Sequence, residues 1–272
     1  PRCYNKLFER LHMNAIMLPC EIKKGELPKL LDACRLMGIH YLCPTMPHKS
    51  DFVDLLDDVD ETSKLFHSVN AIRLDENGSH GSGMDGKGAV KAMEEGGAKL
   101  NGINALLYGA GGISGVTAYE LAQSGVKKLY IANRTPEKAE KIASLVNEHT
   151  AATAEVIGTD AAALDKAAES CELFANLTPL GMKGFDKKHD YLGFIDRMPK
   201  TATVFDCVIN PPLSETITAA RTAGLNTVPG MRMLVAQMDV IFKFLFNQTV
   251  TGADKQACIE ELCNYLGVPS NF

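Results

Sequence analysis

The chain has 272 residues, of which 46% are hydrophobic and 22% are charged, and its formal net charge is −5. This composition is typical of a folded globular protein, and the length fits one large domain or two of medium size. Acidic and basic residues are interspersed without a basic stretch, which argues against a nucleic-acid partner. No apolar run approaches the roughly 18 residues that span a bilayer, so we expect a soluble protein without a membrane partner.

The cysteine and histidine patterns give no indication of a metal site. The eight cysteines contain no CxxC pair, and the seven histidines contain neither HxxxH nor HExxH. Most of the cysteines lie in apolar surroundings, which predicts reduced thiols and a cytoplasmic location. The chain starts at Pro1 rather than at a methionine, which suggests that residues of the protein precede it.

The first 85 residues alternate between short strand and helix patterns. This alternation predicts an α/β domain with a largely parallel sheet. Its last part is rich in glycine and polar residues and is expected to form turns. The expected elements are a helix over 4–11, a strand over 15–22, a helix over 27–38 closed by Gly38, strands over 40–43 and 68–74, and the turn-rich stretch 75–88.

A clearer repetition of strand, turn and helix begins at Asn104 and continues to residue 224. Such a succession predicts a doubly wound, Rossmann-type sheet. Two helix patterns, over 233–248 and 253–267, follow the last strand unit and are expected to return to the first domain. The predicted division is therefore a domain of residues 1–85 with 238–272, and a second domain of residues 86–237.

A proline-rich segment over residues 44–52, PTMPHKSDF, follows the strand expected at 40–43. Pro44 and Pro47 restrict the backbone, so the segment can present His48 and Lys49 in a fixed direction. On these residues alone the simpler interpretation, a solvated lysine after the end of a strand, is favoured because most lysines lie on the surface.

A glycine-rich turn follows the first strand of the second domain. In GAGGISG (109–115) the glycines permit a tight turn, and the helix that follows points free N–H groups at whatever lies above it. Ser114 stands at the third position of the strict GxGxxG pattern. The strand–turn–helix context predicts a dinucleotide site rather than a plain glycine-rich turn. The cofactor-binding residues predicted at this turn are Gly109, Ala110, Gly111, Gly112 and Ile113.

The next strand ends in Asn133, Arg134 and Thr135, where an NAD site would place an acidic residue for the ribose. Arg134 can bind a 2′-phosphate through charge-assisted hydrogen bonds, and Asn133 and Thr135 add donors. The pattern therefore favours NADP over NAD. The alternative for Arg134 is an ordinary surface arginine that leads into the following helix.

Seven motifs in this order resemble the shikimate dehydrogenase family, which includes the quinate/shikimate enzymes. They extend over nearly the whole chain. They are PHK (47–49), SVNAI (68–72), GMDGKG (83–88), GAGG (109–112), NRT (133–135), NLTPLGM (176–182) and GMRMLVAQ (230–237).

The resemblance implies an N-terminal substrate domain, a Rossmann domain for NADP and an active site in the cleft between them. It implies a cytoplasmic enzyme of aromatic amino acid biosynthesis that reversibly reduces 3-dehydroshikimate or a similar cyclic keto acid. Its partner would be a small cyclic hydroxy acid, and the protein would be a monomer or homodimer. The implied residues are Lys49 and Asp85 for catalysis, Thr45, Asn70 and Gln237 for substrate binding, Asn176, Thr178 and Met182 on the nicotinamide side, and Gly230 for cofactor binding.

In this interpretation Lys49 acts as acid in one direction and as base in the other, while Asp85 holds it and the reacting hydroxyl in place. Asp85 can at the same time be the N-cap of the helix that begins near Gly86. Both roles are compatible with the resemblance.

Several positions depart from the family pattern and leave the substrate open. The family usually has polar residues where this chain has Cys43, Ala71, Met84 and Ile209, and Gly83 also departs from the usual motif. A cleft with fewer polar partners indicates a substrate with fewer or altered hydroxyl groups, or poor turnover of shikimate itself. The serines that bind the substrate carboxylate in the family would lie before Pro1.

Two alternatives remain open from the sequence. One is a quinate-type or other alicyclic polyol dehydrogenase on the same fold. The other is a non-catalytic NADP-binding regulator, which the altered substrate positions favour. The joint presence of Lys49, Asp85 and Gln237 argues against a regulator, because a sensor needs no group for proton transfer.

Overall fold

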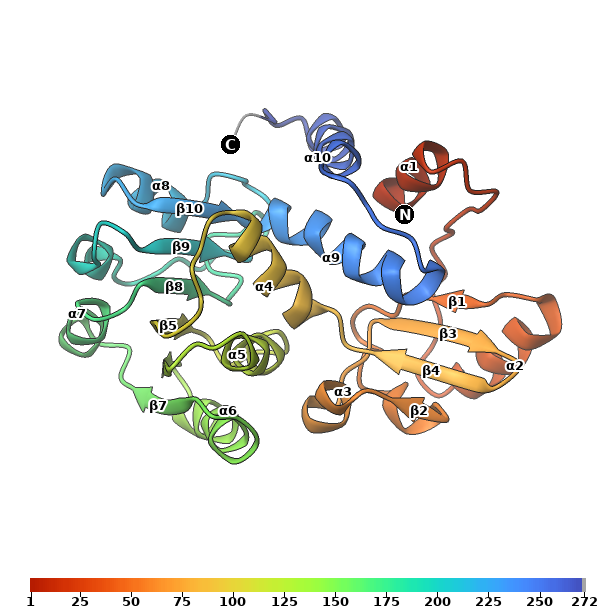
Figure 1. Cartoon of the computed structure of the whole chain (residues 1–272), viewed down its shortest axis with the longest axis horizontal. Helices are drawn as coiled ribbons and strands as arrows, with labels where there is room; N and C mark the ends of the chain where they lie inside the picture. The colour runs from red at the N-terminus through yellow and green to blue at the C-terminus, as the bar shows by residue number, and fades with distance from the viewer. Residues whose placement is uncertain (271–272) are drawn as a thin grey trace. The chain divides into compact units, whose positions relative to one another are not determined.

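The computed structural model describes residues 1–270, and the chain divides into two compact units (Figure 1). The first unit comprises residues 1–85 and Met238–Glu261; the second comprises Gly86–Gln237 and, of the described residues, 262–270. The division made from sequence assigned all of 238–272 to the first domain. The residues after Glu261 therefore group differently from that assignment, and residues 271–272 lie outside the described part.

A four-stranded sheet with the order β1-β3-β4-β2 forms the centre of the first unit. α2 illustrates how local sequence sets an element: Pro28 lies in its first turn, and Gly38, with φ of +67°, adopts the left-handed conformation that ends it. The elements are α1 (Arg2–Arg10), α2 (Leu27–Met37), β1 (Tyr41–Leu42), η1 (Val53–Leu55), β2 (Asp58–Val59), α3 (Glu61–Phe66), β3 (Ala71–Asp75), β4 (Gly78–Ser82) and the C-terminal α10 (Gly252–Leu266), of which Gly252–Glu261 belong here.

The predicted largely parallel sheet is wrong for this unit. β3 pairs antiparallel with both β1 and β4, and β2 pairs parallel with β4. β4 lies within the stretch 75–88 that the sequence indicated as turns, because its pairing with β3 compensates for a composition of glycine, serine and histidine.

The strand predicted over residues 15–22 is also not formed. Its apolar residues satisfy the strand pattern, but no described strand pairs with them. The side chain of Asn5 takes the place of a neighbouring strand at one point, since its Oδ1 accepts from the Met17 N–H at 2.7 Å and its Nδ2 donates to the Met17 oxygen at 3.2 Å. A strand needs a partner as well as a suitable composition.

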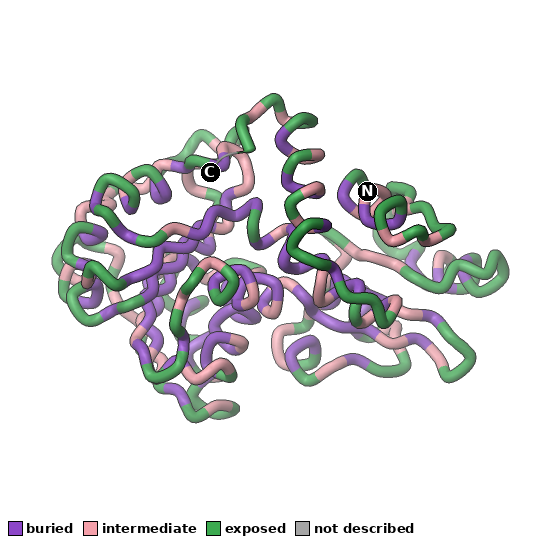
Figure 2. Tube along the Cα trace, turned by 45° about the horizontal axis from the view of Figure 1, so that its top comes forward, coloured by how far each residue is buried: buried purple, intermediate pink, exposed green. Residues whose placement is uncertain are grey.

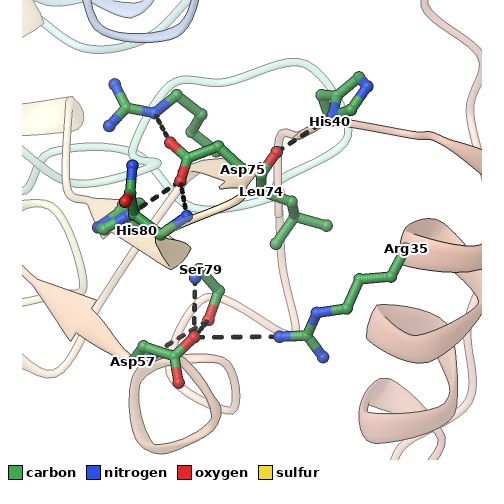
Figure 3. Close-up of polar contacts among 9 residues, drawn as sticks. Arg35, His40, Asp57, Leu74, Asp75, Ser79 and His80 are labelled. Carbon is green, nitrogen blue, oxygen red and sulfur yellow. Dashed lines mark hydrogen bonds and ion pairs between the residues drawn. The ribbon is translucent and has the colours of Figure 1, made fainter.

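Polar contacts at the turn between β3 and β4 fix the hairpin (Figure 3). Asp75 accepts from the Nε of Arg73 and from the N–H of Asn77, each at 2.9 Å. Asp57 accepts from the N–H and the hydroxyl of Ser79, at 2.8 and 2.7 Å. These donors stabilise the carboxylates and hold the pKa of both aspartates below the usual range.

The second unit contains a six-stranded sheet with the order β10-β9-β8-β5-β6-β7, in which every pairing is parallel. This confirms the predicted doubly wound α/β fold. The elements are α4 (Asp85–Glu95), β5 (Asn104–Tyr108), α5 (Ser114–Gln123), β6 (Lys128–Ala132), α6 (Pro136–His149), β7 (Thr153–Ile157), α7 (Ala161–Ala168), β8 (Leu173–Asn176), η2 (Gly193–Arg197), β9 (Thr203–Asp206), α8 (Glu215–Thr222), β10 (Asn226–Pro229) and α9 (Gly230–Phe246), of which Gly230–Gln237 belong here.

Two apolar layers cover the faces of this sheet, and the central strands are buried along their length (Figure 2). One layer holds side chains of α4, α5 and α6, and the other holds side chains of α7, η2 and α8. The chain moves from β5 to β6 on one side, whereas β8 lies on the other side of β5. The carboxyl ends of β5 and β8 therefore form the switch point at which such sheets bind ligands.

α4 begins at the last residue of the first unit, and α9 leads the chain back into that unit after Gln237. Among residues 1–270, no helix is long and apolar enough to cross a membrane.

Candidate functional site

Lys49 projects from a segment whose backbone is held at several points. The N–H of His48 donates to the oxygen of Thr45 at 2.9 Å, and the His48 Nε2 lies 2.8 Å from the oxygen of Ile22. The Lys49 oxygen accepts from the N–H of Val69 at 2.9 Å. The Lys49 side chain thus starts from a fixed backbone. The side chain of Thr45 is exposed and bonds to none of the described residues.

A carboxylate and a carboxamide hold the Lys49 amine. Its Nζ donates to Oδ2 of Asp85 at 2.6 Å, and Oδ1 of Asp85 accepts from Nδ2 of Asn70 at 3.0 Å. Oδ1 of Asn70 accepts from the N–H of Met84 at 2.6 Å, which fixes the orientation of the carboxamide. The side chains of Lys49 and Asp85 are 27% and 16% exposed, so the amine can reach a ligand while it stays oriented.

Apolar groups border this pair in the first unit. Ala71 and Met84 are buried in a cluster with side chains of α9, and Tyr4 and Cys43 pack against that cluster. Burial raises the pKa of both the Tyr4 phenol and the Cys43 thiol. Tyr4 was not among the residues found from sequence, since a lone tyrosine in an amphipathic helix carries no such signal.

The glycine turn of the second unit requires glycine at its first position. Gly109 has φ of +116°, and a Cβ there would lie 2.6 Å from Cγ2 of Thr178. The turn after β5 and the segment after β8 therefore meet at the switch point. Gly111 and Gly112 face open space, which leaves room for a ligand above the turn.

Two backbone amides of the turn are available to an anion. Within the described residues, the N–H groups of Gly112 and Ile113 have no hydrogen-bond partner, and both precede the first turn of α5. The N–H of Ala110 donates to Oδ1 of Asn133 at 3.1 Å, and that of Gly111 donates to the hydroxyl of Ser114 at 3.0 Å. The free amides fit a pyrophosphate. Ser114 fixes the turn from the third position of the motif.

Asn133, Arg134 and Thr135 follow β6 and have different roles. The carboxamide of Asn133 is used within the turn region, because its Nδ2 also donates to the oxygen of Thr135 at 2.7 Å. Arg134 is exposed and forms no hydrogen bond or ion pair with any residue of the described part. Arg134 is thus the group in this motif that can bind a phosphate.

Asn176 and Thr178 follow β8, but their side chains are not equally accessible. Asn176 is fully buried, and its Oδ1 accepts from the N–H and the hydroxyl of Thr178 at 3.1 and 2.7 Å. Its Nδ2 donates to Oδ1 of Asp206 at 2.9 Å. Thr178 is half-buried beside the turn. Sequence reasoning missed Asp206, although a charged residue at the end of a buried strand is a signal that could have found it.

The remaining predicted positions also lie in the second unit. Gly230 begins α9 where a Cβ would lie 2.5 Å from the oxygen of Val208, so only glycine fits. Met182 is exposed. Gln237 is buried, and a Cβ on Gly88 would lie 2.6 Å from the Cβ of Gln237, so the two residues are in close contact.

Cysteine and histidine chemistry adds no further centre within the described residues. All eight cysteines are free thiols, and five of them are buried. No group of three or more His, Cys, Asp or Glu side chains among residues 1–270 could hold a metal ion.

Comparisons with known proteins give the family. The family model described as shikimate dehydrogenase substrate binding domain matches residues 1–72, and the model described as shikimate / quinate 5-dehydrogenase matches residues 90–167. A shikimate dehydrogenase (NADP(+)) of Alkaliphilus oremlandii is 31% identical over 249 residues, which cover 89% of this chain and 85% of that protein. The chain belongs to the shikimate dehydrogenase family.

Solved structures agree with this assignment. Shikimate 5-dehydrogenase from Listeria monocytogenes, described in complex with shikimate and NAD, has a TM-score of 0.87 at 25% identity and covers 96% of this chain and 91% of its own. A 5-ketofructose reductase of a Gluconobacter strain has the same TM-score and identity and covers 96% and 92%. Membership confirms the family resemblance and the two-part shikimate dehydrogenase fold predicted from sequence.

Proposed function

We propose that this chain is an NADP-dependent oxidoreductase that reversibly reduces 3-dehydroshikimate, or a similar cyclic keto acid, to the alcohol. The observation that carries the proposal is the Lys49–Asp85 pair, in which an ammonium group lies 2.6 Å from a carboxylate. Asn70 holds that carboxylate from its other side. The family to which the chain belongs supports the same reaction class.

Reduction of a ketone places a hydride on the carbon and a proton on the oxygen. Bound NADPH supplies the hydride when it is present. The ammonium of Lys49 donates the proton to the carbonyl oxygen, and in the reverse direction the neutral amine removes it from the hydroxyl. Asp85 keeps the amine in one position through both directions. A well-placed acid or base of this kind contributes about 10²- to 10⁴-fold in rate.

Arg134 supports NADP as the cofactor. Its guanidinium is exposed beside the glycine turn and has no described partner that a phosphate must displace. A bidentate contact with a 2′-phosphate would supply the difference in affinity between NADP and NAD. The curated relative from Alkaliphilus oremlandii is named for NADP(+) as well.

The surroundings of the pair support a substrate with fewer polar partners on one side. Ala71 and Met84 are buried in an apolar cluster, and Tyr4 and Cys43 pack against it. A buried hydroxyl group without a hydrogen-bond partner is costly in free energy. These apolar side chains therefore favour a substrate ring that turns carbon atoms, rather than hydroxyl groups, towards them. A polyol dehydrogenase with another ketone substrate is the second candidate, and the similarity to a 5-ketofructose reductase favours it.

NADPH absorbance with a panel of cyclic and open-chain keto acids and polyol ketones tests the reaction. We expect turnover of at least one compound, and Lys49→Ala should lower kcat by about 10²-fold or more while the Kd of NADPH stays the same. Lys64→Ala is the matched control, because this exposed lysine of the first unit pairs with Asp58 instead. Tight NADPH binding without turnover of any compound would favour the regulator. Quinate and shikimate in the oxidative direction distinguish a quinate-type enzyme.

Arg134→Ala tests the cofactor separately. We expect the Kd of NADPH to rise by about 10-fold or more, since a charge-assisted contact is lost, and the Kd of NADH to stay the same. Equal losses for the two cofactors would contradict the assignment of Arg134 to the 2′-phosphate. A monomer or homodimer and a cytoplasmic location stay predictions of the sequence.

A further inference from the structure

A buried carboxylate at the end of β9 is the start of a hydrogen-bonded chain that the proposed reaction leaves unexplained. Asp206 is fully buried. Its Oδ1 accepts from Nδ2 of Asn176 and from the N–H of Val208, both at 2.9 Å, and its Oδ2 accepts from the hydroxyl of Ser214. Ser214 is also the N-cap of α8, because its hydroxyl accepts from the N–H of Ile217. The carboxylate thus joins β8, β9 and the start of α8.

Asn176 transmits this arrangement to Thr178. A carboxamide can be rotated by half a turn with little change in shape, so its two ends must be distinguished by their partners. The carboxylate of Asp206 accepts hydrogen bonds and therefore selects the NH₂ end. The oxygen of Asn176 is then turned towards Thr178, where it accepts from both the N–H and the hydroxyl. Asp206 and the N–H of Thr178, which can only donate, therefore select the same orientation of the carboxamide from its two ends.

Thr178 lies at the ligand-binding edge of the sheet. It follows β8, and its Cγ2 is the atom that a Cβ on Gly109 would meet at 2.6 Å. The carboxyl ends of β5 and β8 are the switch point of this sheet. A shift of Thr178 would therefore change the surface next to the glycine turn.

We propose that Asp206 is a positioning residue for the dinucleotide: through Asn176 it holds Thr178 against the glycine turn, and its ionised form does so more firmly than its protonated form. The inference rests on the proposed function, because the dinucleotide is taken to be NADPH. A protonated carboxyl group is a weaker acceptor than a carboxylate, so it holds the NH₂ end of Asn176 less firmly.

The surroundings of Asp206 place its titration in an accessible range. Burial raises its pKa to about 6, although the hydrogen bonds from Ser214, Val208 and Asn176 act in the opposite direction. The hydroxyl, N–H and carboxamide groups that donate to Asp206 do not titrate in this pH range. Burial raises the pKa of the neighbouring Cys207 thiol to about 12. Glu215, the next residue of α8, accepts instead from the N–H of His189 at 2.8 Å. Asp206 is the carboxylate of this network that changes charge near pH 6, and burial lowers the pKa of the His189 imidazole, which interacts with Glu215, below its usual value.

The ratio of NADPH affinities of the wild type and Asp206→Asn, measured from pH 5 to pH 8, tests the proposal. We expect the wild type to bind about 10-fold more tightly at pH 8, where its carboxylate is ionised, and the ratio to approach one at pH 5. The titration of the ligand itself cancels in the ratio. Asp165→Asn is the control: this carboxylate of α7 accepts from the hydroxyl of Tyr191, and its ratio should be one at every pH.

Thr178→Val provides a second readout that general damage to the fold would not give. If Asp206 acts through Thr178, the double variant Asp206→Asn/Thr178→Val should bind NADPH no more weakly than Thr178→Val alone. Additive losses, or a ratio that does not change with pH, would overturn the proposal. Failure of the wild type to bind NADPH would overturn the proposed function as well, whereas binding with an unchanged ratio would overturn this inference alone.

Ser214→Ala keeps the proposal testable if Asp206→Asn does not fold. Loss of the hydroxyl removes a donor to the ionised carboxylate, so the pH at which NADPH affinity falls should move upward relative to the wild type. An unchanged midpoint would count against Asp206 as the titrating group.

Discussion

At the scale of single residues, Asn70 decides whether Asp85 is aimed at Lys49. Its carboxamide connects the N–H of Met84 to Oδ1 of Asp85. Asn70→Ala should lower kcat by about 10-fold or more, because Asp85 loses the contact that orients it. The Kd of NADPH should not change, since the variant alters no residue of the second unit. Steady-state kinetics and a cofactor titration measure the two quantities.

Asn77→Ala is a suitable control for that variant. Asn77 lies at the turn between β3 and β4 and contributes its backbone N–H, not its side chain, to Asp75. Its removal should leave kcat unchanged. A loss of NADPH binding in Asn70→Ala that equals the loss of kcat would indicate general damage rather than a role in aiming Asp85.

The sequence predicted the residues of the site better than their contacts. Lys49 and Asp85 stand in recognisable motifs, and the structure brings their charged atoms into contact. Asn176 also stands in a motif, but its carboxamide is buried and acts on Thr178. Which group a side chain reaches depends on pairing across the sheet, and the register of β8 and β9 that places Asn176 beside Asp206 has no local signature.

At the scale of elements, strands were predictable where burial on both faces gives a continuous apolar run, as in β5 and β8. They were not predictable where pairing alone makes the strand. β4 has a composition typical of a turn, yet it pairs with β3 over its whole length. Residues 15–22 have a composition typical of a strand but lack a described partner. Composition reports burial, while strand formation also requires a neighbour.

The N-cap of α3 connects this helix to β4. Asp60 accepts from the N–H of Ser63 at 2.9 Å and also from the hydroxyl of Ser82, the last residue of β4. Asp60→Ala should lower the free energy of unfolding of the first unit by about 1–2 kcal/mol, because a cap and a side-chain contact are lost. Asp60→Asn, which keeps the acceptor for Ser63, should lose less. Equal losses in the two variants would contradict the capping role; urea unfolding gives the values.

At the scale of the whole molecule, the buried carboxylate of Asp206 sets how stability depends on pH. Its pKa in the folded chain is about 6, above the usual value of 3.8. The folded chain therefore binds the proton more tightly than the unfolded chain does, and this contribution to stability is present below pH 4 and is lost as the pH rises to about 6. A shift of about two units corresponds to about 3 kcal/mol.

Other carboxylates act in the opposite direction and at lower pH. The pKa of Asp254 is lowered by hydrogen bonds from Thr251 and Arg10, and those of Asp57 and Asp75 are lowered by their hairpin donors. Their contributions are present above pH 4 and are lost as the pH falls through the lowered values. The contributions of these carboxylates and of Asp206 therefore change with pH in opposite senses.

Comparison of Asp206→Asn with the wild type isolates the contribution of this one carboxylate. The two proteins should have similar free energies of unfolding at pH 4, where Asp206 is neutral. By pH 7 the free energy of unfolding of the variant should exceed that of the wild type by up to about 3 kcal/mol. Urea unfolding, followed by hydrogen exchange in peptides of β8 and β9, measures the difference in the free energy of unfolding of the second unit. Parallel pH curves would show that Asp206 does not titrate as a buried acid. A variant that is more stable at neutral pH and yet binds NADPH more weakly would mean that the chain keeps an unfavourable buried charge for the sake of its ligand.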